Sequence, residues 1–305
     1  MSDKKRNHII PKVYYKSFTC DSNQKLTNQY LIKDKTVQEL ISIKNVAVEK
    51  HYFLYRNYDG SYNTEIEDRL AKYESNEITS IISRIRNKTS LLALPEHIAF
   101  DDKDKDSIIN MIINFQTRAK DFREYSIKTT DTVLPEFLNE LVQSDKSNRI
   151  QKEIDNQILR DKERFLDECI KRTVLEKQSS LQQYLFSSRY CLFFRNYTSL
   201  PFITSDEPVI YVNIFNNQCG ITKTALKDHF TVIYFPVTPH IIIGLYSAAL
   251  MNFRKEYDNR LFDLSNKDYK FIRYMNDLQM KTAHNCVISN DINVLRFYQD
   301  QQIIA

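Results

Sequence analysis

The stretch Ser205-Asp206-Glu207-Pro208 places two acidic residues at a stiff corner between two apolar segments. Pro208 lacks a backbone N–H and favours an extended conformation at Glu207, so both carboxylates are held at a rigid turn. Two interpretations of this corner are open. It is an ordinary β-turn, or it is a site in which Asp206 is a catalytic residue and metal ligand and Ser205 binds a ligand.

Two glutamates lie along one line of the helix that the sequence predicts over 64–87. Apolar residues continue this line at three- and four-residue spacing towards the end of the helix. In one interpretation the helix leaves the core near Glu67 and Glu74, and Glu67 completes a capping box with Thr64. In the other, both glutamates are metal ligands and Glu74 is also catalytic.

The next predicted helix, 106–125, has an apolar stripe with Gln116 and Arg118 on its two shoulders. An arginine at the edge of such a stripe usually extends to the solvent or pairs with an acid at the edge of the core. An arginine held there also suits a phosphate, because its planar guanidinium contacts two oxygens at once. Arg118 is therefore a candidate catalytic residue, and Gln116 a candidate ligand-binding residue.

A histidine and a tyrosine near the N-terminus complete the set of candidates. Pro11 prevents the residues around His8 from starting a helix, and 12–18 are predicted to form a short helix with inward-facing aromatic side chains. His8 then lies beside these aromatics, as a structural histidine bonded to a backbone carbonyl or as a catalytic residue. Tyr14 is a candidate ligand-binding residue.

Composition limits the classes of protein that this chain can belong to. Its 305 residues suffice for one large domain or two of ordinary size, and the 42% that are apolar provide a sizeable core. A net charge of +4 is too small to indicate a nucleic-acid-binding protein by itself. With only 3 glycines, Gly-rich phosphate loops and a turn-dense β-sandwich are both disfavoured.

Cysteine usage and hydropathy indicate the compartment. The 5 cysteines are scattered and include no Cys-x-x-Cys motif, which favours free thiols in a reducing compartment over disulfides or a structural zinc site. No apolar run has the length of a signal-peptide core or approaches the roughly 18 residues of a membrane span. The sequence therefore predicts a cytoplasmic protein that does not enter a membrane.

The predicted elements make an α+β fold with an N-terminal hairpin, an α-helical middle and a C-terminal, mainly antiparallel sheet with a covering helix. We expect a single α+β domain over 1–305, which can be sub-divided into a mainly helical half, 1–180, and a sheet-containing half, 181–305. The expected helices span 64–87, 106–125, 133–142, 150–177 and 265–284. The expected strands span 29–33, 37–43, 189–195, 202–203, 209–214, 230–235, 240–245, 286–288 and 294–298.

The helix within 148–177 is long and highly charged, with a thin apolar stripe. Such a stripe suits an outer helix with a solvated face, or one that faces a protein partner or a second copy of the chain.

Five motifs occur in an order that carries a family resemblance. They are Asn7-His8-x-x-Pro11-x-x-Tyr14-x-x-x-Phe18, the helix with Glu67 and Glu74, the helix with Gln116 and Arg118, Ser205-Asp206-Glu207-Pro208-Val209, and Phe235-Pro236-Val237-Thr238-Pro239. Over 7–285 the chain thus resembles a bacterial domain-of-unknown-function family, number 4238. Tyr15 and Glu207 depart from the residues usual in that family. The resemblance implies a pattern for the whole fold and no reaction, and similar uncharacterised bacterial cytosolic proteins often occur in genome-defence or toxin contexts.

Functions of different classes fit these residues. The first is a metal-assisted hydrolase, such as a nuclease, in which the histidine and acidic candidates hold Mg²⁺ or Mn²⁺ and Arg118 stabilises the phosphoryl transition state. The second is a non-catalytic sensor or binding module, whose pocket, lined by Arg118, His8 and tyrosines, binds a nucleotide or an RNA segment. The third is a structural subunit that docks through 148–177 and needs no site.

Overall fold

The largest sheet has five strands in the order β12-β7-β11-β10-β9. The computed structural model to which it belongs describes residues 6–56, 61–90, 100–129, 179–220, 228–250 and 255–304. The five strands are β7 (Arg189–Asn196), β9 (Ile210–Asn213), β10 (Thr231–Thr238), β11 (Ile241–Ser247) and β12 (Arg260–Leu264). Neighbours are antiparallel, as predicted for 189–245, whereas the edge strand β12 pairs with β7 in the parallel direction.

The two faces of this sheet carry alternate residues of each strand. On β10, Ile233 and Phe235 belong to a core shared with the N-terminal half of the chain. Val232 and Tyr234 face the opposite way and pack in a second core with α9 (Tyr269–Thr282). Every residue of β10 is buried, so this sheet is covered on both faces.

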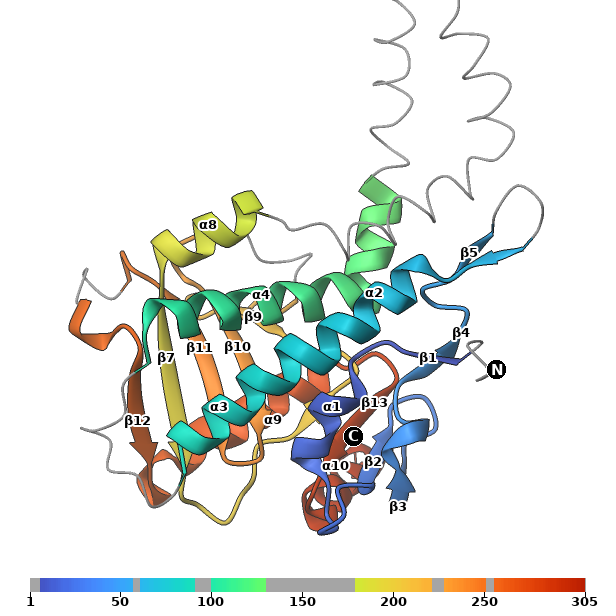
Figure 1. The fold of residues 1–305 in the computed structure, drawn as a ribbon. Coiled ribbons are helices and arrows are strands. Elements are labelled where there is room, and N and C mark those ends of the chain that lie inside the picture. The colour runs from blue at the N-terminus through green and yellow to red at the C-terminus, as the bar shows by residue number, and fades with distance from the viewer. Residues whose placement is uncertain are drawn as a thin grey trace, which may run out of the picture.

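Helices α3 (Thr79–Lys88) and α4 (Asp102–Arg118) run side by side across the face opposite α9 (Figure 1). α3 is the last part of one long helix. α2 (Glu65–Tyr73) is followed without a break by a π-helical turn, Glu74–Ile78, and then by α3. α8 (Ser179–Ser188) packs against α4 and leads directly into β7.

A four-stranded antiparallel sheet joins the two ends of the chain in the order β3-β2-β13-β8. It contains β2 (Leu26–Leu31), β3 (Thr36–Ser42), β8 (Thr204–Ser205) and β13 (Cys286–Ser289), and α10 (Ile292–Ile304) packs on it. Two short pairs complete the described strands: β1 (Arg6–His8) with β4 (Val48–Lys50), and β5 (Tyr55–Arg56) with β6 (Tyr62–Asn63).

The structure confirms the α+β class and several local predictions. The β2–β3 hairpin forms, close to the predicted bounds. α1 (Lys12–Tyr15) and the 3-10 turn Lys16–Phe18 bury their three aromatic side chains completely. The covering helix predicted over 265–284 forms as α9, just after a capping box of Ser265 and Asp268. None of the described helices is long and apolar enough to cross a membrane.

Two predicted strands are wrong. Residues 202–203 are not a strand, because their amides donate to the Pro239 carbonyl and the Asn276 side chain, and β8 begins one residue later. The predicted strand 294–298 lies in α10, whose buried Val294, Leu295 and Tyr298 recur at helical spacing.

Two helix predictions are also corrected. The hydroxyl of Thr64 donates to the Asp68 carboxylate, so no capping box with Glu67 forms. The helix predicted over 106–125 is two helices, because α4 ends at Arg118, Ala119 is extended, and helical backbone resumes at 120–129. The helices predicted at 133–142 and 150–177, including the partner-facing surface of 148–177, lie outside the described residues.

Replacing Gly244 by alanine should destabilise the large sheet. The added Cβ would lie 2.6 Å from Cε2 of Tyr246 and 3.2 Å from Cε1 of Tyr234. The hydroxyls of these two tyrosines are hydrogen-bonded to each other at 2.6 Å, which restrains both rings. We expect Gly244→Ala to lower the free energy of unfolding by about 1–3 kcal/mol, as overpacking does, measured by urea denaturation. Tyr246→Ala removes the obstructing ring, so Gly244→Ala should cost less in that background. An equal cost in both backgrounds would contradict this explanation.

Candidate functional site

A buried ion pair between two helices forms the centre of the candidate site. Nη1 of Arg118, at the end of α4, donates to Oε1 of Glu74 at 2.6 Å. The Arg118 side chain is 0% exposed and that of Glu74 is 27% exposed, so the pair reaches the surface through the carboxylate. Burial lowers the pKa of Arg118 and the Glu74 charge opposes that effect. The sequence-based expectation that Arg118 pairs with an acid at the edge of the core is thus met.

The guanidinium of Arg118 is incompletely bonded. Its Nε and Nη2 atoms are buried, and no group in the described part of the chain accepts a hydrogen bond from them. The ring of Phe53 lies 5.7 Å from the guanidinium carbon and supplies a cation–π contact. Such a contact leaves the two in-plane N–H groups unsatisfied. One edge of a fully buried cation is therefore without an acceptor among the described residues.

The partner of Arg118 begins the π-helical turn. Glu74 is the first residue of that turn, and the Thr79 hydroxyl donates back to the Glu74 carbonyl at 2.9 Å. A π turn inserts an extra residue into the helical repeat and rotates the side chains that follow it. Short π segments are frequent at functional sites, and nothing in the apolar periodicity predicted this one.

Two side chains from distant parts of the chain produce the helix break after Arg118. The Tyr52 hydroxyl donates to the Arg118 carbonyl at 2.8 Å. On the other side of the break, Oε1 of Glu207 accepts from the amides of Lys120 and Asp121 at 2.6 and 3.3 Å. Glu207 thus acts as the N-terminal cap of the helix 120–129, as a capping residue within the same helix would. The break is a tertiary feature, absent from the local sequence.

Asp206 binds backbone rather than a partner side chain. Its carboxylate accepts from the amides of His284, Asn285 and Cys286 at 3.1, 2.7 and 3.4 Å. These amides precede or begin β13, so Asp206 ties the corner to the four-stranded sheet. Burial raises the pKa of Asp206, and the three amide donors oppose that rise.

Glu207 is the more strongly perturbed acid of the corner. Burial, together with the negative charges of Asp206 and Asp121, raises the pKa of Glu207 well above its usual range. Nε2 of Gln279, on α9, donates to Oγ of Ser205 at 2.5 Å and to the Glu207 carbonyl at 2.7 Å. The corner is therefore a junction between α9, β13 and the helix 120–129, and the β-turn interpretation describes only its backbone.

The remaining candidates occupy supporting positions. Nδ1 of His8 lies 3.1 Å from the Val46 carbonyl, in agreement with the structural interpretation. The Tyr14 hydroxyl bonds the Thr204 hydroxyl at 2.6 Å and the Pro236 carbonyl at 2.5 Å. Gln116 is buried two residues before Arg118, and side chains at that spacing on a helix point in different directions.

The acidic candidates do not gather into a metal site. Glu67 lies seven residues before Glu74 on one helix, about 10 Å along its axis, and Asp206 is bonded to the amides before β13. Among the described residues, no group of three His, Cys, Asp or Glu is placed to hold a metal ion. Of the predicted set, the structure brings Glu74 and Arg118 into contact.

Sequence reasoning missed Tyr52, Phe53, Glu207 and Gln279 as contributors to this region. Glu207 carried a signal, since it stands beside Asp206 at the same corner and departs from the resembled family. The other three carried none, because each acts through contacts with residues more than sixty positions away.

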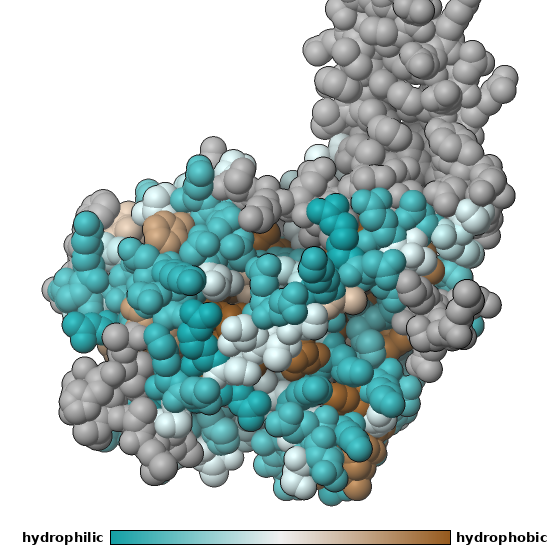
Figure 2. Space-filling model, in the orientation of Figure 1, coloured by the Kyte–Doolittle hydropathy of each residue, from teal (hydrophilic) through white to brown (hydrophobic). Residues whose placement is uncertain are grey.

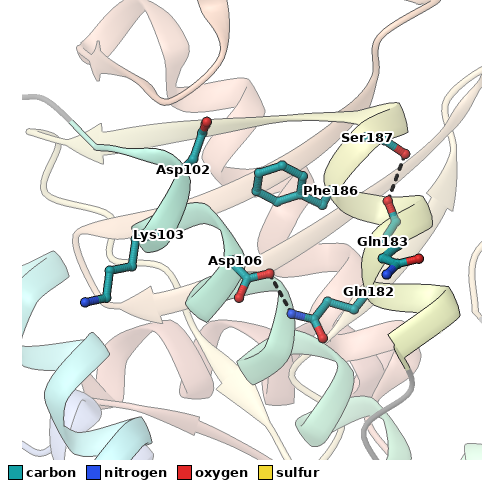
Figure 3. Close-up of a pocket in the computed structure, with 7 residues that line it drawn as sticks. All are labelled: Asp102, Lys103, Asp106, Gln182, Gln183, Phe186 and Ser187. Carbon is teal, nitrogen blue, oxygen red and sulfur yellow. Dashed lines mark hydrogen bonds between the residues drawn. The ribbon is translucent and has the colours of Figure 1, made fainter.

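Two surface clefts lie along α4, and neither includes a residue of the predicted set. An open cleft of about 700 Å³ lies between the start of α4 and α8. Phe186 points into it between Asp102 and Asp106, and Gln182 donates to Asp106 at its edge (Figure 3). A smaller cleft of about 140 Å³ lies between the π turn, α3 and α4.

Asp206→Asn should destabilise the fold. The asparagine amide replaces one acceptor oxygen with a donor, which leaves at least one buried backbone N–H unpaired. We expect a loss of about 1–3 kcal/mol in the free energy of unfolding, measured by urea denaturation. Asp34→Asn, at an exposed turn between β2 and β3, is the control and should change little. A stability equal to wild type would show that the three amide bonds contribute nothing.

Glu207→Gln should change how stability depends on pH. In the wild type the folded-state pKa of Glu207 is raised, so the folded protein holds a proton that the unfolded chain has lost above about pH 4.3. Stability therefore falls as pH rises through the folded-state pKa. Glutamine keeps one carbonyl oxygen for both amides of the next helix and does not titrate.

Urea denaturation between pH 5 and 8 measures this effect. The stability of Glu207→Gln relative to wild type should rise with pH, whereas Glu124→Gln, on an exposed part of the helix 120–129, should run parallel to wild type. A constant difference between Glu207→Gln and wild type across this range would contradict the prediction.

Comparison with known proteins places nearly all of the chain in one family. The model of the family described as "Protein of unknown function (DUF4238)" matches residues 6–293. No curated protein and no solved structure gives a significant match. Because the matched residues span nearly the entire chain, the protein belongs to the DUF4238 family.

Proposed function

We propose that this protein is a non-catalytic binding module whose ligand carries an oxyanion, a phosphate or a carboxylate, received by Arg118. The observation that carries this proposal is that the Nε–Nη2 edge of a fully buried guanidinium has no acceptor among the described residues. That edge presents two N–H groups in a geometry that matches two oxygens of one phosphate or carboxylate. Arg195 uses the same edge in the same chain, where Nε and Nη2 bind the two oxygens of Asp263 at 2.8 and 3.0 Å.

The energetics of burial support a ligand at this edge. A buried donor left without an acceptor costs about 1–3 kcal/mol, and more on a charged group, and Arg118 has two such donors. A bound oxyanion would accept hydrogen bonds from both donors. It would also add negative charge beside the Arg118 cation, which is paired with a single carboxylate, that of Glu74. The Glu74 side chain is partly exposed, so it connects the buried guanidinium to the solvent.

The surroundings of Arg118 favour a nucleotide among ligands of this kind. Phe53 stacks near the guanidinium, and Tyr73 lies close enough for the Arg118 charge to lower its pKa, which burial raises to about 12. Aromatic faces of this kind bind nucleobases by stacking. A phosphate on Arg118 with a base against Tyr73 would use both features.

The metal-assisted hydrolase receives less support from the same residues. Asp206, its central ligand, is occupied by three backbone amides, and Glu74 already neutralises Arg118. A nuclease would need free carboxylates that converge on one point. The genome-defence context in which similar uncharacterised bacterial proteins often occur suits a nucleotide sensor as well as a nuclease.

Arg118→Lys tests the binding proposal, because lysine keeps the charge and loses the two-donor edge. Isothermal titration with phosphate, pyrophosphate, AMP, ATP and citrate should give binding to at least one of them in the wild type, weakened at least tenfold in Arg118→Lys. Glu74→Gln should tighten binding of the same ligand, since it removes the carboxylate that competes for the guanidinium. A purely structural pair predicts no tightening.

Arg195→Lys is the matched control, because it alters another fully buried, ion-paired arginine and should leave ligand affinity unchanged. Equal losses in both lysine variants would assign the effect to the fold and overturn the proposal. Absence of binding across the panel would overturn it as well. Chelator-sensitive cleavage of RNA or DNA with Mg²⁺ or Mn²⁺ would replace it with the hydrolase.

A further inference from the structure

The smaller cleft is built from side chains of opposite charge on one face of a helix. Tyr73, Asn76 and Glu77 come from the π turn and the residue before it, and Arg84 comes from α3. Ser107 closes the cleft from α4. The molecular face that carries α2 and α3 is mostly hydrophilic (Figure 2), so the cleft is a polar hollow in a polar surface.

The charged groups of the cleft are available to a ligand. Among the described residues, the Glu77 carboxylate makes no hydrogen bond or ion pair. Burial raises the pKa of Tyr73, and the negative charge of Glu77 adds to this rise. Arg84 uses Nη1 for Oδ1 of Asp104 at 2.7 Å and is 36% exposed. Lys88 also neutralises that carboxylate, through its other oxygen at 2.6 Å. Within the described residues Arg84 makes no further hydrogen bond, and its side chain lines the cleft.

The two opposite charges of the cleft fit a small zwitterion. Glu77 and Arg84 are seven residues apart, nearly two full turns of a helix, so both side chains lie on the same face. Both line the same small cleft, so a molecule that contacts both needs an ammonium and a carboxylate close together. An α-amino acid, with its ammonium towards Glu77 and its carboxylate towards Arg84, has this arrangement.

The size of the cleft limits the ligand to a small molecule. Its volume of about 140 Å³ equals that of roughly five water molecules at about 30 Å³ each. The lining offers hydroxyl and amide groups, from Ser80 and Asn76, with one aromatic ring from Tyr73. A polar side chain is therefore better accommodated than a large apolar one.

We propose that the cleft between the π turn, α3 and α4 binds a free α-amino acid. This site shares Tyr73 with the oxyanion site proposed at Arg118 but depends on a different pair of charges, Glu77 and Arg84. The π turn links the two, since Glu74 begins it and Glu77 lies within it. The extra residue of the π turn determines which side chains of this helix face the cleft.

Three forms of each ligand separate the two charges in a binding experiment. Serine and glutamine are titrated as free amino acids, as N-acetyl derivatives without the ammonium, and as amides without the carboxylate, with binding followed by ligand-observed NMR and calorimetry. In the wild type at least one free amino acid should bind at least tenfold more tightly than either of its derivatives.

Variants then assign each charge to its partner. In Glu77→Gln, N-acetylation should no longer weaken binding, and in Arg84→Gln, amidation should no longer weaken binding. Arg86→Gln, on the exposed side of the same helix, should match the wild type. Failure of both amino acids to bind, or equal binding of all three forms, would overturn the proposal. So would an unchanged preference for the free amino acid in both cleft variants.

Discussion

The rest of this structure depends on how backbone amides are bonded at two points where a strand or a helix begins. The N–H groups before β13 and those that begin the helix 120–129 have no partner within a strand or helix of their own. Burying them unpaired would cost about 1–3 kcal/mol each. Asp206 accepts the first group and Glu207 accepts the second. Two adjacent side chains therefore join the four-stranded sheet to the helical layer.

The position of Arg118 follows from that junction. α4 stops at Arg118 because its carbonyl is bonded by Tyr52 and the next helix starts under the Glu207 carboxylate. The last turn of α4 is thereby fixed against the segment that carries Phe53 and against the helix that carries Glu74. The ion pair, the aromatic contact and the helix break all involve the end of α4. A substitution at the corner would therefore also change the position of the Arg118 guanidinium.

The strongly periodic parts of the fold were predictable from the sequence. Hydrophobic spacing predicted the helix that became α2, the π turn and α3. The position of Arg118 at the shoulder of an apolar stripe left solvent, an acid or a phosphate open as its surroundings. The acid itself could not be chosen, because Glu67 and Glu74 lie on the same line and only tertiary packing brings Glu74 to Arg118. The helix break at Ala119 was beyond local reasoning, since its cap lies 87 residues away in the chain.

The strand error at the corner has a different origin. The apolar residues 202–203 resembled a strand, but their amides bond to a turn and to a side chain of α9. For Asp206 the sequence left a turn and a site both open, because acids between buried segments suit either. The structure shows how such acids are also used to satisfy main-chain donors. The parallel pairing of β12 with β7 could not be predicted from local sequence patterns, because the two strands are far apart in the chain.

Two buried arginines in this chain help to separate structural from functional roles. Arg195 has a bidentate carboxylate and donates to the Ser90 carbonyl, so its guanidinium is held as a structural ion pair would be. Arg118 is equally buried and has one carboxylate oxygen, with two donors unpaired. If its role were structural alone, an apolar side chain of similar volume at this position, with Glu74 turned to the solvent, would avoid the desolvation cost of the cation. The cost of an incompletely bonded guanidinium is understandable when the missing acceptor belongs to another molecule.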